Sequence, residues 1–134
     1  DNTCVPLGSS QAPQEVLDWI AEVHAAGIST CVVSNNIHVR EVTRSARLLG
    51  SQAVACAFKP APFSVWVALR KMGVSRGEAV LVGDQVFTDV LAARLADVRA
   101  ILVRPQTRRD LWYARPLRLL ERRVLGAHRF EGER

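Results

Sequence analysis

Short apolar runs alternate with stretches of helical periodicity along most of this chain, and this alternation constrains the fold more than any other feature. The apolar runs predict four strands, at Ile28–Val33, Ala53–Phe58, Ala79–Gly83 and Arg99–Val103. Helices are expected around them, at about 13–26, 37–49, 62–72 and 88–95. Strands and helices that alternate at this spacing are typical of βαβ units, so we expect an α/β fold with a parallel sheet.

Length and composition favour a single globular domain over residues 1–134. Apolar residues make up 49% of the chain and charged residues 23%, which excludes a disordered chain. No apolar stretch approaches the roughly 20 residues that a membrane span needs. The three cysteines, Cys4, Cys31 and Cys56, lack metal-binding spacing. Free thiols in a reducing compartment account for them, and we therefore expect a cytoplasmic protein.

Polar side chains of three different kinds follow three successive predicted strands. Ser34 ends the first, Lys59 the second, and Asp84 the third, with Asp89 five residues later. Ligands of open α/β sheets bind at the carboxyl ends of the strands. A hydroxyl and an ammonium can hold phosphoryl oxygens, and paired carboxylates suit Mg²⁺. These residues are the parts of a phosphoryl-transfer site, although each alone is also explained as a cap, a loop residue or a turn residue.

Four ordered motifs resemble those of the haloacid dehalogenase (HAD) phosphatases, in particular the subfamily IIIA group that includes the YqeG family and the phosphatidylglycerophosphate phosphatases. The motifs are Asp1-Asn2-Thr3, Ser34-Asn35-Asn36, Lys59-Pro60, and Gly83-Asp84-Gln85 followed by Thr88-Asp89. The resemblance extends over nearly the whole chain. It implies a Rossmannoid three-layer α/β/α fold without a cap domain, and a Mg²⁺-dependent phosphomonoester hydrolase.

The resemblance also implies a role for each matching residue. Ser34 would bind the transferring phosphoryl group, with Asn35 shaping the phosphate pocket. Lys59 would hold both the phosphate and the nucleophile. Asp84 would ligate Mg²⁺, and Asp89 would ligate it or orient a bound water.

The first motif is incomplete in this sequence. Asp1 matches the second aspartate of the family's Asp-x-Asp motif, the general acid/base whose carbonyl also meets the metal. Thr3 matches the threonine that supports this loop. The nucleophilic aspartate would stand two positions before Asp1, and the strand before it would lie at the centre of the sheet. We therefore expect a gap in the sheet and read the chain as truncated, inactive as it stands but derived from an active parent.

The segments around the site are too short for a cap domain, so we expect an open site that admits bulky substrates. The resemblance favours a lipid-borne phosphomonoester, phosphatidylglycerophosphate. The tail, about 105–134, fits such a substrate, because 104–134 holds nine of the eighteen basic residues. Arginines with Trp112 and Tyr113 could contact the inner face of a membrane. An ordinary terminal helix at Leu117–Leu125, packed on the sheet, explains the tail slightly better, because this helix is short.

Two other functions stay open at this point. A degenerate, non-catalytic HAD domain could bind a partner through the basic tail. A nucleic-acid end phosphatase would use the tail on DNA or RNA, but the tail's aromatic residues are not spaced for base stacking, which makes nucleic acid the weaker expectation.

Overall fold

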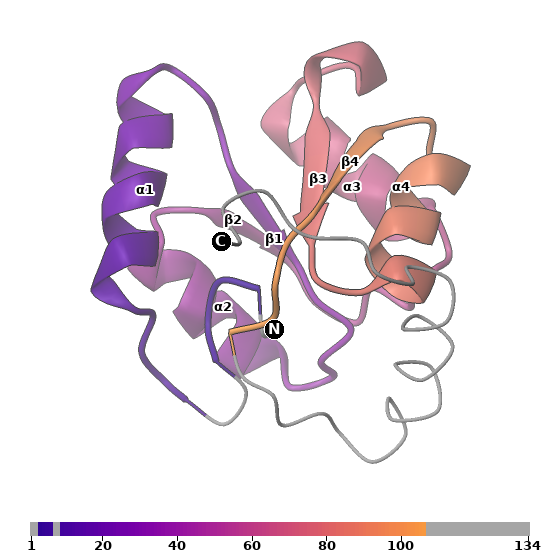
Figure 1. Ribbon diagram of the computed structural model, residues 1–134. Helices are drawn as coiled ribbons and strands as arrows, with labels where there is room; N and C mark the ends of the chain where they lie inside the picture. The colour runs from indigo at the N-terminus through magenta and orange to yellow at the C-terminus, as the bar shows by residue number, and fades with distance from the viewer. Residues whose placement is uncertain (1–2, 7–8, 107–134) are drawn as a thin grey trace, which may run out of the picture.

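The computed structural model describes residues 3–6 and 9–106, which form an α/β fold (Figure 1). This confirms the predicted fold class. The elements in chain order are α1 (Gln14–Ala25), β1 (Cys31–Val33), α2 (Val39–Leu48), β2 (Gln52–Val54), α3 (Phe63–Met72), the 3₁₀ turn η1 (Arg76–Glu78), β3 (Val80–Gly83), the π-helical turn η2 (Val86–Val90), α4 (Leu91–Leu95) and β4 (Arg99–Leu102).

The strands form two parallel pairs. Strand β1 pairs with β2, so that Cys31 lies opposite Gln52, and β3 pairs with β4, so that Val80 lies opposite Arg99. Within the described residues no strand joins β1 to β3. A cavity of about 240 Å³, lined mainly by apolar residues of β1, β3, α1 and α3, lies between the pairs. The sheet is therefore interrupted at the position that the sequence predicted.

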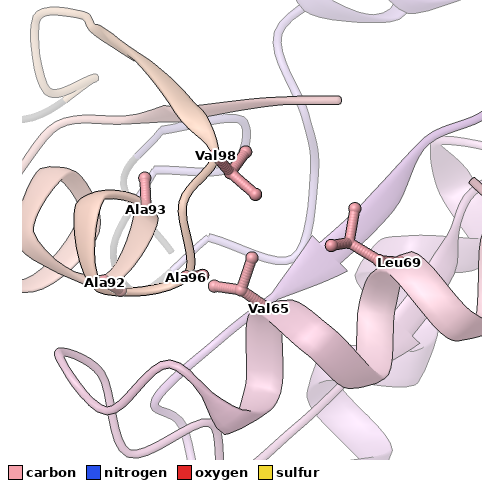
Figure 2. Close-up of a cluster of buried hydrophobic side chains, with 6 residues drawn as sticks. All are labelled: Val65, Leu69, Ala92, Ala93, Ala96 and Val98. Carbon is pink, nitrogen blue, oxygen red and sulfur yellow. The ribbon is translucent and has the colours of Figure 1, made fainter. Parts of the chain in front are cut away.

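Helix α3 connects the two strand pairs. It packs on β1 and β2 and also contributes Val65 and Leu69 to the main buried cluster. Figure 2 shows these side chains in one cluster with Val98, with Ala92 and Ala93 of α4, and with Ala96, which directly follows α4. The alanines are completely buried, and they share one buried cluster with Val65 and Leu69 of α3. This packing fixes the β3 end of the site relative to the β1 end.

The second strand ends earlier than the sequence predicted. Residues 55–58 form a loop in which Cys56 and Phe58 have φ angles of 50° and 51°. The left-handed region is incompatible with an extended strand, so the predicted end at Phe58 is wrong. The first strand is also shorter than predicted. Its pairing with β2 begins at Cys31, opposite Gln52, so residues 28–30 lie outside the paired region.

The helix predicted at 88–95 begins differently. Residues Val86–Val90 form one π-helical turn, in which the N–H of Val90 donates to the carbonyl of Gln85 at 3.2 Å, and α4 follows directly. Such turns occur frequently at functional sites. Among the described residues no helix is long and apolar enough to cross a membrane. Asp1, the basic tail from residue 107 onwards and the helix predicted at Leu117–Leu125 lie outside the described residues.

Candidate active site

The structure brings the polar strand ends together at one edge of the sheet. Ser34 directly follows β1, and its N–H donates to the carbonyl of Val54 at 2.9 Å, which extends the β1–β2 ladder by one bond. Lys59 lies in the loop after β2, and Asp84 directly follows β3. Ser34 and Asp84 are 1% and 4% exposed. Burial of these polar side chains at strand ends is the geometry expected of a ligand site in a parallel sheet.

A buried ion pair joins the two strand pairs at this edge. The Nζ atom of Lys59 lies 2.5 Å from Oδ1 of Asp89 and donates to the carbonyl of Val33 at 3.0 Å. The Lys59 and Asp89 side chains are only 11% and 6% exposed. Because Val33 belongs to β1 and Asp89 to η2, the ammonium ties together the β1 side and the β3 side of the site. A pair this deeply buried is destabilising if either partner is removed.

The carboxylate of Asp89 also fixes the loop that carries Asp84. Its second oxygen, Oδ2, accepts hydrogen bonds from the N–H groups of Asp84 and Gln85, both at 3.1 Å. The hydroxyl of Thr88 donates to Oε1 of Gln85 at 2.7 Å and closes the same turn. Asp89 therefore holds the Asp84 main chain through one oxygen and the Lys59 ammonium through the other.

Thr3 places the start of the chain against this turn. Its hydroxyl donates to Oδ1 of Asp84 at 2.8 Å, and its carbonyl accepts from Nε2 of Gln106 at 3.2 Å. Thr3 is the only member of the first motif that the structure describes, and it lies next to the third strand's carboxylate. The role of Thr3 in supporting the first-motif loop stays a prediction. Asp1 lies outside the described residues.

Asn35 holds Lys59 in place through its main chain. The amide oxygen Oδ1 accepts from the N–H of Lys59 at 2.8 Å, and Nδ2 donates to the Lys59 carbonyl at 3.1 Å. The hydroxyl oxygen of Ser34 accepts from the N–H of Asn36 at 3.1 Å and shapes the turn between them. The roles of Ser34 and Asn35 in phosphate binding stay predictions. Their hydrogen bonds show how the loop after β1 orients the loop after β2.

Comparison with known proteins agrees with this geometry. Residues 57–117 match the sequence pattern of the HAD-hydrolase-like family. Over 132 residues the chain is 33% identical to a probable phosphatase, YqeG, of Bacillus subtilis (strain 168), an alignment that covers 98% of the chain and 76% of that protein. The chain belongs to the HAD-like phosphatases. It is therefore a member of a family of hydrolases.

Two solved structures share the fold. A HAD phosphatase from Thermococcus onnurineus superposes on 90% of the chain with a TM-score of 0.63 and 23% identity. A hydrolase from Streptococcus pneumoniae TIGR4 superposes on 86% with a TM-score of 0.59 and 19% identity. The chain spans 60% and 57% of the lengths of these two proteins. At this identity the likeness establishes the fold of this HAD member and nothing about its substrate.

The carboxylate oxygens at this site are of the kind that binds a hard cation. The described residues include only some of the groups that would ligate one. Within residues 3–6 and 9–106, no three His, Cys, Asp or Glu side chains gather as a metal cluster. Asp84 and Asp89 supply carboxylate oxygens, the ligands that Mg²⁺ prefers. Both oxygens of Asp89 already bind the Lys59 ammonium or main-chain N–H groups. The roles of Asp84 and Asp89 toward a metal therefore stay predictions.

Gly83 is a site residue whose role the sequence did not reveal. A Cβ at this position would lie 2.3 Å from the Cβ of Asp89 and 2.4 Å from its carboxylate carbon. Glycine is therefore needed for the Asp89 side chain to fold back over the end of β3. The contact between the Lys59 ammonium and the Val33 carbonyl could not be predicted from the sequence either. A main-chain acceptor is present in every residue type and leaves no sequence signal.

Replacing Gly83 by alanine should displace Asp89 and lower the free energy of unfolding by about 1–3 kcal/mol, as overpacking typically does. Denaturant unfolding of the protein at its natural length measures this loss. The matched control is Gly77→Ala, where an added Cβ meets nothing within 4 Å. Equal stability of the two variants would contradict the close approach of Asp89 to Gly83.

Two cysteines line the cavity between the strand pairs, and burial changes their chemistry. Burial raises the pKa of the Cys4 thiol, and it also raises the pKa of Cys31. Both thiols should hold less of the reactive thiolate near neutral pH than an ordinary cysteine does. We expect iodoacetamide at pH 7.5 to alkylate both more slowly in the native protein than in urea, as followed by peptide mass spectrometry. Equal rates in the two conditions would show that these thiols are not buried.

Proposed function

We propose that the protein containing this chain, at its natural length, is a Mg²⁺-dependent phosphomonoester hydrolase that acts on phosphatidylglycerophosphate. The observation that carries the proposal is the convergence of a buried hydroxyl, an ammonium and two carboxylates at three successive strand ends, in a member of a hydrolase family. Hydrolysis of this substrate yields phosphatidylglycerol and inorganic phosphate.

The described side chains have the chemistry that binding of a phosphoryl group requires. A lysine ammonium carries three donors, and the bonds to Asp89 and Val33 use two of them. In the proposal the third donor of Lys59 reaches a phosphoryl oxygen, and the hydroxyl of Ser34 binds another. Asn35 keeps Lys59 in register for this contact through its two main-chain hydrogen bonds.

The remaining groups of the proposed mechanism lie at the third strand and at the first motif. Asp84, together with the carbonyl of Asp1, would hold Mg²⁺, which supplies positive charge to neutralise the phosphoryl oxygens. The carboxylate of Asp1 would give and take the proton of the leaving group and of water. An aspartate two positions before Asp1 would serve as the nucleophile, since an aspartyl-phosphate divides hydrolysis into two easier steps.

The described segments on either side of the first two strands supply no cap domain, which supports a bulky substrate. Between Asn35 and Lys59 the structure has only α2, β2 and short loops, and residues 9–13 before α1 are loop. Neither segment forms a cap over the strand ends. A phosphate displayed at a lipid surface could therefore reach Ser34 and Lys59. In this proposal the protein works in the cytoplasm, with peripheral contact at the inner face of the membrane, and the basic tail contributes to that contact.

Phosphate release from three substrates tests the proposal. The protein at its natural length is incubated with phosphatidylglycerophosphate in mixed micelles, with glycerol 3-phosphate, and with a 5′-phosphorylated oligonucleotide. We expect the lipid to react fastest, EDTA to stop the reaction, and added Mg²⁺ to restore it. Preference for the oligonucleotide would replace the lipid with a nucleic-acid end, and no metal-dependent release from any substrate would refute phosphatase activity.

A further inference from the structure

Three large apolar side chains on the loops that carry Ser34 and Lys59, and at the start of α3, are exposed to solvent. Ile37 is 69% exposed, Phe58 73% and Phe63 66%. We call these three residues the apolar rim. Single exposed apolar residues are ordinary on protein surfaces. The apolar rim differs because its members lie on the loop after Ser34 and on the segment that flanks Lys59 on both sides.

Hydrogen bonds join the two rim-bearing loops to each other and to the site. The N–H of Cys56 donates to the carbonyl of Asn36 at 3.2 Å, and the N–H of Ala57 donates to the carbonyl of Ser34 at 2.9 Å. The Asn35 amide binds both main-chain groups of Lys59. Ile37 and Phe58 therefore belong to the same hydrogen-bonded unit as the residues proposed to bind phosphate.

The backbone of Phe58 shows that its exposed position is built into this unit. Its φ angle of 51° is unfavourable for a bulky side chain. The turn is closed by the N–H of Ala61, which donates to the carbonyl of Phe58 at 3.0 Å. The main chain around Phe58 is therefore held by hydrogen bonds, while its phenyl ring is exposed.

Positive charge lies beside the apolar rim. Helix α2 begins two residues after Ile37, and it exposes Arg40 and Arg44, which are one helical turn apart. Glu41 is the acidic residue of its first turn, and its carboxylate accepts from Nδ2 of Asn36 at 3.1 Å. An apolar surface bordered by arginines is complementary to an anionic lipid surface, which offers negative headgroups above an apolar interior.

We propose that the apolar rim inserts into the interfacial region of an anionic phospholipid bilayer and brings Ser34 and Lys59 down to the level of the lipid phosphates. This inference rests on the proposed function, because it names the surface on which that site would work. Phenyl rings and branched aliphatic chains gain free energy in proportion to the apolar area they bury in the membrane. The arginines of α2 then meet anionic headgroups at the edge of the contact.

Vesicle binding tests the apolar rim directly. The protein at its natural length is sedimented with vesicles of phosphatidylcholine and phosphatidylglycerol, and compared with the double variant Ile37→Ser, Phe58→Asn. Asparagine tolerates the positive φ at position 58. We expect vesicle affinity to fall about tenfold or more, since each substitution removes a large apolar area that would be buried in the membrane. Unchanged affinity, or no binding by the wild-type protein, would overturn the proposal.

The controls remove equally exposed apolar side chains away from the apolar rim. Leu48→Ser and Leu95→Ser are suitable, because these leucines are 51% and 54% exposed and lie at the final residues of α2 and α4. We expect both variants to bind vesicles as the wild type does. If they weaken binding as much as the double variant, adsorption depends on general hydrophobicity and the assignment to the apolar rim is wrong.

Hydrolysis measured in parallel separates this inference from the proposed function. The double variant should hydrolyse glycerol 3-phosphate at the wild-type rate and lose activity only on phosphatidylglycerophosphate embedded in vesicles. Equal loss on both substrates would overturn the membrane role of the apolar rim. If the wild-type protein hydrolyses neither substrate while vesicle binding still depends on the apolar rim, the proposed function fails and the membrane contact stands.

Discussion

Replacing Asp89 by alanine is expected to lower the free energy of unfolding by about 3–5 kcal/mol, the range found when one partner of a buried ion pair is removed. The substitution would leave the Lys59 ammonium without its carboxylate at a position where that side chain is 11% exposed. It would also remove the acceptor of the N–H groups of Asp84 and Gln85. Denaturant unfolding of the protein at its natural length measures the loss.

A surface pair supplies the control for this prediction. Arg76 and Asp97 lie 3.6 Å apart, but their side chains are 60% and 85% exposed. Solvent screens such pairs, so Arg76→Ala should cost less than about 1 kcal/mol. Asp89→Asn should fall between the two variants, because the amide keeps an oxygen for the N–H groups and loses the charge. An Asp89→Ala loss no larger than that of Arg76→Ala would show that the buried pair does not stabilise the site.

The sequence predicted which residues meet at the site because the rule it used concerns strand direction. Parallel strands place their carboxyl ends at one edge, so Ser34 and Asp84, which directly follow β1 and β3, were expected to converge. Lys59 reaches the same edge only through the loop after β2, where Asn35 binds its main chain. The division of the strands into two pairs followed from the incomplete first motif. The first expectation depends on the order of elements along the chain, which periodicity reports well. The second was implied by the resemblance to the family, whose central strand precedes the first motif.

The loops could not be predicted in the same way. Ala53–Phe58 has the composition of a strand, yet β2 ends at Val54 and the following residues turn. Tertiary hydrogen bonds from Cys56 and Ala57 to the loop after β1 decide this, and they have no local signature. The hydrogen-bond partners of the two Asp89 oxygens could not be predicted either. They depend on the π-helical turn and on the close approach of Asp89 to Gly83.

Asp84→Asn is expected to separate activity from stability. Asparagine has the shape of aspartate and keeps an oxygen for the Thr3 hydroxyl, which now lies 2.8 Å from Oδ1. The fold should therefore survive. The charge that would hold Mg²⁺ is lost, and we expect hydrolysis to fall about 10²–10³-fold, as when one electrostatic contact to a transition state is removed. Phosphate release at increasing Mg²⁺ measures both the rate and the metal requirement.

The two carboxylates are thus expected to fail in different ways. Loss of Asp89 should unfold the site, whereas loss of the Asp84 charge should leave a folded protein that needs more Mg²⁺ and turns over slowly. Asp97→Asn is the matched control, since this exposed aspartate has a φ of 59° that asparagine tolerates. It should change neither property. If Asp84→Asn retains wild-type hydrolysis at the same Mg²⁺ concentration, Asp84 is not the metal ligand. Asp89, whose carboxylate binds the Lys59 ammonium, is then the remaining candidate ligand.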